Sequence, residues 1–122
     1  MEHPMTYVCS PLSALSRAEM LANAAKASTY MVFAEKEFGG RAVAPHAYLP
    51  YLLDDMVPEE RALALEFGLK LLGLCSQVVV YGSRISNGMK NEIAAAEQLG
   101  IPILYRPAIP GIAEARGDNN AV

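Results

Sequence analysis

Short apolar runs, each ended by proline, glycine or polar residues, alternate along the chain with longer segments of helical spacing. The short runs predict strands at residues 7–9, 42–44, 77–81 and 101–104. The longer segments predict helices at residues 16–38, 58–75 and 91–99. The predicted order is therefore strand, helix, strand, helix, strand, helix, strand.

Residues that begin and end helices support this division. Ser16 and Glu19 have the spacing of a capping box, in which each side chain satisfies a free backbone amide of the first turn. Pro58 suits the first position of the second helix because it has no amide hydrogen to leave unpaired. Gly39 and Gly100 follow the first and third helices, where glycine commonly ends a helix.

Strands that alternate with helices form a parallel sheet covered by helices on both faces. We therefore predict a three-layer α/β fold with a short doubly wound parallel sheet of four or five strands in the order 2-1-3-4, Rossmann-like or flavodoxin-like. The 122 residues suit one domain, expected at residues 1–105, with a loosely ordered C-terminal tail at 106–122. Residues 47–57 are expected to be irregular.

Composition and charge narrow the classes of function. Ten basic against 13 acidic residues give a net charge of −3, which argues against a broad face for a nucleic-acid polymer. The two cysteines, Cys9 and Cys75, are too few for a disulfide scaffold, and no spacing of His, Cys and acids suits a metal, so we expect neither metal nor cofactor. The start does not resemble a signal peptide, and charges interrupt the apolar stretch 62–81, so we expect a cytoplasmic protein without a membrane partner.

The predicted fold indicates where a ligand binds. In doubly wound sheets the ligand lies beyond the carboxyl ends of the strands, where the strand order reverses, here between the first and third strands. The loops at residues 10–16 and 82–89 follow these strands, and the segment from His46 opens on the same edge. Glycines and a helix N-terminus suit an anion or a sugar, although an ordinary capped loop would have the same residues. The candidates for ligand contact are Ser10, Pro11, His46, Gly82, Arg84, Ser86, Asn87, Gly88 and Met89.

Acidic and basic side chains near this edge are candidates for chemistry. Glu92 lies in the helix after the glycine loop, and Asp54 and Asp55 lie in the segment after the second strand. Two carboxylates at one cleft can act as nucleophile and acid, although an acid at either place can also stabilise a helix N-terminus. Arg61 or Arg84 could hold a phosphate, or each could be a solvated charge.

Three further features have both functional and structural interpretations. His46 could polarise a ligand group or move a proton, or it could be a hydrogen-bonded structural residue. Cys9 ends a buried strand and is expected to be inert core. Residues 48–53 are too apolar for a free loop and are expected to lie under a partner subunit or to fold over the cleft as a lid.

Several of these motifs together resemble a known family. They are the first strand ending in Tyr7-Val8-Cys9-Ser10-Pro11, the pair Pro45-His46, and Ser86-Asn87-Gly88-Met89 with Glu92 three residues further on. This combination resembles the nucleoside 2-deoxyribosyltransferase-like superfamily, and more closely a small bacterial and phage branch of it. The resemblance covers residues 5–105.

The resemblance implies a role for each of these residues. In this superfamily a glutamate at the place of Glu92 attacks the anomeric carbon of a nucleoside sugar, and the base departs. Ser86, Gly88 and Met89 would line the sugar or its 5′ side, and Tyr7 would border the base. The better-known transferases carry an aspartate in the loop after the third strand, which here holds no acid.

That departure from the family pattern favours a hydrolase of nucleoside 5′-monophosphates, with Arg84 or Ser86 at the phosphate and Asp54 or Asp55 as the acid. The expected function is therefore that of an N-glycosidase or deoxyribosyltransferase-like enzyme acting on a nucleoside or its 5′-monophosphate. The alternatives are a protein that binds or sequesters a nucleotide, such as an ADP-ribose-like signal, without cleaving it, and an oligomeric adaptor. We expect a homodimer or a larger homo-oligomer in each case.

Overall fold

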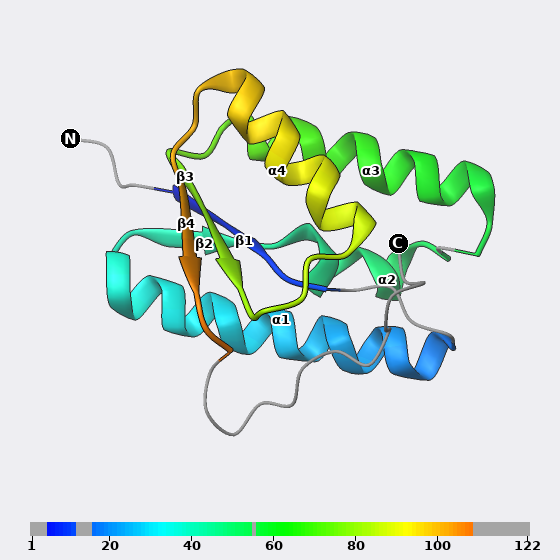
Figure 1. The fold of residues 1–122 in the computed structure, drawn as a ribbon. Coiled ribbons are helices and arrows are strands. Elements are labelled where there is room, and N and C mark those ends of the chain that lie inside the picture. The colour runs from blue at the N-terminus through cyan, green and yellow to red at the C-terminus, as the bar shows by residue number, and fades with distance from the viewer. Residues whose placement is uncertain (1–4, 12–15, 55, 109–122) are drawn as a thin grey trace.

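The structure is a computed structural model that describes residues 5–11, 16–54 and 56–108, and it has helices on both faces of a sheet (Figure 1). Its elements are, in chain order, β1 (Met5–Cys9), α1 (Arg17–Phe38), β2 (Arg41–Val43), the 3₁₀ helix η1 (Pro45–Ala47), α2 (Leu49–Leu52), α3 (Pro58–Leu72), β3 (Gln77–Tyr81), α4 (Asn87–Leu99) and β4 (Ile103–Arg106). The predicted α/β class is confirmed.

The described strands form one four-stranded sheet in the order β2-β1-β3-β4. All three pairings are parallel, and Tyr7 lies opposite Val43 on one side and Val78 on the other. The predicted order 2-1-3-4 is therefore confirmed. The order reverses between β1 and β3, so the carboxyl ends of these two strands diverge into loops on either side of a common opening.

The two faces of the sheet carry separate apolar clusters. Helix α1 covers one face, and α3 and α4 cover the other (Figure 1). Successive strand residues point to opposite faces, so Val8 and Val79 pack with α1, whereas Tyr7, Cys9 and Val80 pack towards α3 and α4. Burial on both faces explains why the strands are continuous apolar runs and do not alternate with polar residues.

Capping residues set the helix ends. Ser16 Oγ accepts a hydrogen bond from the Glu19 amide at 3.1 Å, as the capping box predicts. Helix α4 begins at Asn87, earlier than the predicted residue 91, because Ser86 Oγ accepts the Met89 amide at 3.3 Å and so caps the helix there. Gly100, with φ of 74°, ends this helix in the left-handed conformation.

Two other segments differ from the prediction. Residues 47–57 were expected to be irregular. The structure has η1 at residues 45–47 and α2 at residues 49–52. Strand β4 covers residues 103–106 and not 101–104, because the Ile101 amide still bonds to the Ala96 carbonyl at the end of α4. Arg106 is thus a strand residue, and residues 109–122 of the expected tail lie outside the described residues.

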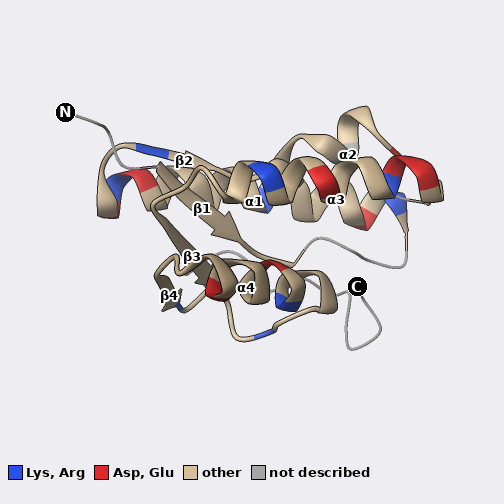
Figure 2. Ribbon diagram, turned by 90° about the horizontal axis from the view of Figure 1, so that it is seen from above, with Lys and Arg blue, Asp and Glu red and all other residues tan. Residues whose placement is uncertain are grey.

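Charged residues are distributed over the helices. Acidic and basic residues lie side by side on α1, α3 and α4 and do not gather on one face (Figure 2). None of the described helices combines the length and apolar character that a membrane crossing requires. The described helices therefore form no single charged face, and a charged side chain can affect ligand binding only where it borders a cavity.

Candidate functional site

A cavity of about 270 Å³ opens beyond the carboxyl end of β1, between α3 and α4. Its walls come from segments far apart in sequence: Tyr7 and Ser10 from β1 and its end, His46 from η1, one face of α3, and the start of α4. The volume lies just below the roughly 300–1,000 Å³ typical of small-molecule sites. A cavity of this size suits a small ligand better than a large one.

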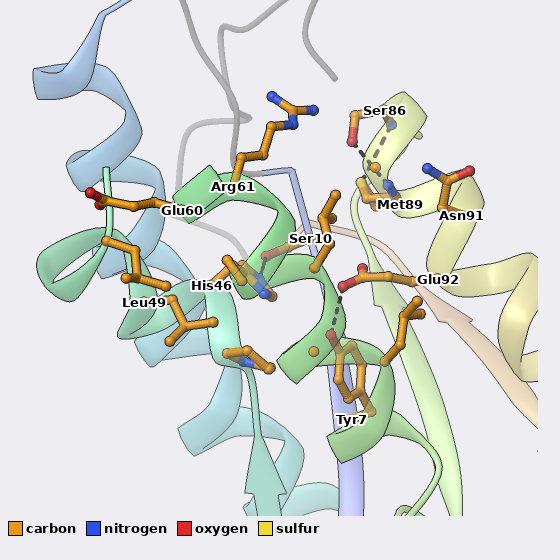
Figure 3. Close-up of a pocket in the computed structure, with 17 residues that line it drawn as sticks. Tyr7, Ser10, His46, Leu49, Glu60, Arg61, Ser86, Met89, Asn91 and Glu92 are labelled. Atoms are coloured by element: carbon orange, nitrogen blue, oxygen red, sulfur yellow. Dashed lines mark hydrogen bonds between the residues drawn. The ribbon is translucent and has the colours of Figure 1, made fainter. Parts of the chain in front are cut away.

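The carboxylate of Glu92 lies at one end of this cavity, with Tyr7 below it (Figure 3). Tyr7 donates a hydrogen bond from its phenol to Glu92 Oε2 at 2.6 Å. The Cys9 thiol donates to the other oxygen, Oε1, at 3.2 Å. Both oxygens are therefore held by side chains of β1, and the orientation of the carboxylate is set before any ligand binds.

Burial controls the ionisation of these three groups. Removal from water raises the pKa of Glu92 above 4.5, and the hydrogen bonds from Tyr7 and Cys9 oppose that change because they stabilise the charged form. Burial raises the pKa values of the Tyr7 phenol and the Cys9 thiol well above their ordinary values, and the Glu92 charge raises them further. Both donors therefore keep their protons near neutral pH.

A second polar pair lies on the same cavity. Ser10 Oγ and His46 Nε2 are 2.9 Å apart, and both residues are buried. Burial lowers the pKa of His46 from 6.5 to about 4, so its imidazole is neutral near pH 7. A neutral ring next to a serine hydroxyl offers hydrogen-bonding groups to a ligand without adding charge.

Helix α3 supplies a wall of the cavity of which only Arg61 was predicted from the sequence. Arg61, Leu65, Gly68 and Leu69 recur at the spacing of one helix face, and all of them line the cavity. A Cβ atom on Gly68 would lie 3.5 Å from Tyr7 Oη, so this glycine leaves open the space beside the phenol. The signal in the sequence was a glycine inside an otherwise regular helix pattern, one helical turn from two leucines.

The structure brings together many of the predicted site residues and leaves others outside. The predicted residues that line the cavity are Tyr7, Ser10, His46, Arg61, Ser86, Gly88, Met89 and Glu92. The predicted residues that do not line it are Pro11, Asp54, Gly82, Arg84 and Asn87. Asp55 lies outside the described residues. In Figure 3, Arg61 and Ser86 face each other across the end of the cavity away from Tyr7.

Asp54, one of the two acids expected from the segment after β2, does not line the cavity. Asp54 is about half exposed, and its Oδ1 accepts the Met56 amide at 2.9 Å in a local turn. Glu60 lines the cavity instead, although its Oε1 accepts the Asp54 amide at 2.6 Å. Asp54 thus makes its contacts in the turn before α3, and Glu60 is an acidic residue on the cavity wall whose carboxylate is directed away from Glu92 (Figure 3).

Ser86 and Cys9 each make a further contact that the sequence did not predict. Ser86 caps α4 as well as lining the cavity, so its hydroxyl is already an acceptor for the Met89 amide. Cys9 is buried in an apolar cluster, as expected, and its thiol also donates a hydrogen bond to Glu92. Among the described residues, no group of three or more His, Cys, Asp or Glu side chains could hold a metal ion.

The fold is that of a Rossmann-like α/β protein, and its described residues form a cavity at the point where the strand order reverses. The chain belongs to the family described as "Domain of unknown function (DUF7768)", which matches residues 4–106. No curated protein matches the chain significantly.

A solved structure similar to this fold is a 2-deoxyribosyltransferase from the psychrotolerant bacterium Bacillus psychrosaccharolyticus. The two share 18% identity over 90% of this chain and 77% of that one, with a TM-score of 0.60. At this identity the likeness establishes a shared fold, one that a nucleoside-processing enzyme also uses.

Proposed function

We propose that this protein cleaves the N-glycosidic bond of a nucleoside or nucleoside 5′-monophosphate, with Glu92 as the nucleophile. The observation that carries the proposal is the Glu92 carboxylate, which borders the cavity with both oxygens held by hydrogen bonds from Tyr7 and Cys9. The likeness of the fold to a 2-deoxyribosyltransferase supports the same chemistry.

In the proposed reaction one oxygen of Glu92 forms a bond to the anomeric carbon of the sugar. The carbon–nitrogen bond breaks, and its electron pair leaves with the base, which takes a proton from water or from a side chain. Water or a second base then displaces Glu92 from the glycosyl ester and restores the carboxylate. Hydrolysis follows if water attacks, and transfer follows if a base does.

Side chains elsewhere on the cavity suit the rest of the substrate. Arg61 lies at the end away from Tyr7, where its guanidinium could bind a 5′-phosphate with two parallel hydrogen bonds. The cavity volume of about 270 Å³ favours one mononucleotide over a polymer. Glu60 is an acidic residue on the cavity wall, but its carboxylate accepts the Asp54 amide and points away from Glu92, so water is the better placed source of the proton for the departing base.

The test is to incubate the purified protein with a panel of nucleosides and 5′-monophosphates and to measure free base by chromatography. Glu92→Gln should abolish base release, because an amide cannot form the glycosyl ester. Glu97→Gln, on the exposed face of the same helix, is the matched control and should retain full activity. Adding a second base separates transfer from hydrolysis. No base release from any member of the panel would refute the proposal.

A second candidate function is nucleotide binding without cleavage. It is favoured by the hydrogen bond between Glu60 and the Asp54 amide, which leaves the Glu60 carboxylate engaged in the fold. Calorimetry with the same panel distinguishes the two functions. A binding protein would hold an intact ligand tightly, and Glu92→Gln would bind it as well as the unsubstituted protein does.

We also propose that the protein is a homodimer or larger homo-oligomer in the cytoplasm. The side chains of Tyr51 and Leu52 on α2 and of Leu63 and Phe67 on α3 are more than half exposed. A second copy covering these apolar side chains would bury them. Light scattering at micromolar concentration tests this, with Phe67→Glu expected to give monomers and Val32→Glu on α1 as the control. A monomeric unsubstituted protein would refute it.

A further inference from the structure

Two alternate residues of β1, Tyr7 and Cys9, contact the carboxylate of Glu92. Tyr7 and Cys9 point to the same face of the sheet because side chains alternate along β1. Their exposed fractions are 1% and 0%, so both donors are fully enclosed. Tyr7 borders the cavity, whereas Cys9 does not, so the thiol holds Oε1 of Glu92 without taking up space in the cavity.

We propose that Cys9 is a positioning residue that aims Oε1 of Glu92 at the anomeric carbon. This inference rests on the proposed N-glycosidic reaction and adds to it the identity of the attacking oxygen and the group that orients it. In that step Oε1 forms the bond to carbon, the carbon–nitrogen bond breaks, and the electron pair leaves with the base, which takes its proton from water.

The difference between the two hydrogen bonds distinguishes the two oxygens. The bond from the phenol to Oε2 is 2.6 Å long, the length of a strong bond to a charged acceptor, and it withdraws electron density from that oxygen. A thiol is a weak donor, and its bond to Oε1 is 3.2 Å long. Oε1 is thus held in direction and keeps more of its nucleophilic character than Oε2.

The thiol has the protonation that this role requires. Burial raises the pKa of Cys9 well above its ordinary value, and the Glu92 charge and hydrogen bond raise it further. Cys9 therefore remains a donor throughout the neutral range and does not compete as a thiolate nucleophile. Because its hydrogen bond stabilises the Glu92 carboxylate, removing it should raise the pKa of Glu92.

Other titratable groups border the same cavity and must be separated from this effect. Tyr7 comes from β1, His46 from η1, and Glu60 and Arg61 from α3. Tyr7 keeps its proton in the neutral range, and His46 is already neutral above a pKa of about 4. Direct measurement of the Glu92 carboxyl by carbon-13 NMR, with Glu92→Gln identifying its signal, separates it from Glu60.

The experiment compares Cys9→Ala, which removes the donor, with Cys9→Ser, which retains one. With the best substrate of the panel, Cys9→Ala should lower kcat about tenfold with KM changed less than twofold. The acid limb of its pH profile, and the Glu92 pKa measured by NMR, should move up by about one unit. Cys9→Ser should recover most of kcat and return the limb towards its original position.

Cys75 provides the matched control, because it is a second buried thiol in the same apolar cluster that donates to the Leu71 carbonyl and not to Glu92. Cys75→Ala should leave kcat and the Glu92 pKa unchanged. Equal effects of Cys75→Ala and Cys9→Ala, or no effect of Cys9→Ala on either quantity, would overturn the proposal. If Cys9→Ala does not fold by circular dichroism, Cys9→Val removes the donor while filling the space.

The two proposals can fail separately. If the unsubstituted protein releases no base from any substrate, the proposed reaction is wrong, and with it the role of Oε1 as the attacking oxygen. The NMR titration then still decides whether Cys9 controls the ionisation of Glu92. If base is released and Glu92→Gln abolishes it, but Cys9→Ala keeps kcat and the pKa, the reaction stands and the positioning role of Cys9 is wrong.

Discussion

Replacing Gly68 with alanine should stabilise the fold and weaken the proposed reaction at the same time. Gly68 lies buried in α3, where glycine is about 1 kcal/mol less favourable than alanine. The added methyl group would lie 3.5 Å from Tyr7 Oη and 3.9 Å from Pro45 Cγ. These are ordinary contact distances, so we expect the free energy of unfolding to rise by roughly 0.5–1 kcal/mol. Urea denaturation measures this gain.

The same methyl group would occupy part of a cavity of only about 270 Å³, beside the phenol that holds Glu92. A ligand that uses this space would be displaced from its reactive position, and small displacements carry large losses of rate. We therefore expect kcat/KM for base release to fall by roughly tenfold or more. The opposite signs of the two effects distinguish a site residue from a residue of the core.

Ala64 is a suitable control because it lies on the same face of α3 and also lines the cavity. Ala64→Gly should lower the free energy of unfolding by roughly the amount that Gly68→Ala raises it, without narrowing the site. A lower free energy of unfolding for Gly68→Ala would show that the added methyl group is in steric conflict with Tyr7. Higher stability with unchanged kcat/KM would show that no ligand reaches this space. Either result would contradict the double role assigned to Gly68.

Three further substitutions test individual groups. Tyr7→Phe removes the 2.6 Å hydrogen bond to Glu92, so base-release assays should show kcat lower by roughly 10- to 100-fold, and an unchanged kcat would contradict this role. Burial lowers the pKa of His46 from 6.5 to about 4. Because the unfolded chain takes up this proton at higher pH, about 3 kcal/mol of stability should be lost as the pH falls from above 6.5 to below 4. For His46→Gln, the free energy of unfolding measured by urea denaturation should therefore change less with pH over that range. An unchanged pH dependence would contradict a buried neutral ring. The Tyr81 hydroxyl is buried without a hydrogen-bond partner among the described residues, so Tyr81→Phe should raise the free energy of unfolding by about 1 kcal/mol, and a loss of stability would reveal a partner.

Much of the fold could be predicted because it depends on local signals. The capping serine at Ser16, the glycine at Gly100 and the short apolar runs determine where helices and strands form. Alternating strands and helices then leave few parallel topologies, and the observed order is the predicted one. Some errors lie at element ends, as where the capping of α4 by Ser86 moves its start to Asn87, and others are short helices that were missed, η1 and α2.

The local pattern of residues is enough to place Glu92 after the loop that follows β3, and the order of the strands puts that loop where the sheet reverses. The side chains that surround this carboxylate depend on the packing of the whole fold. Cys9 and Tyr7 meet Glu92 across 83 and 85 residues of chain, and α3 presents Arg61 and Glu60 to the cavity. These contacts depend on how each helix is rotated about its axis and how closely it packs on the sheet. Such rotations result from the summed packing of the whole core, which no local pattern in the sequence records.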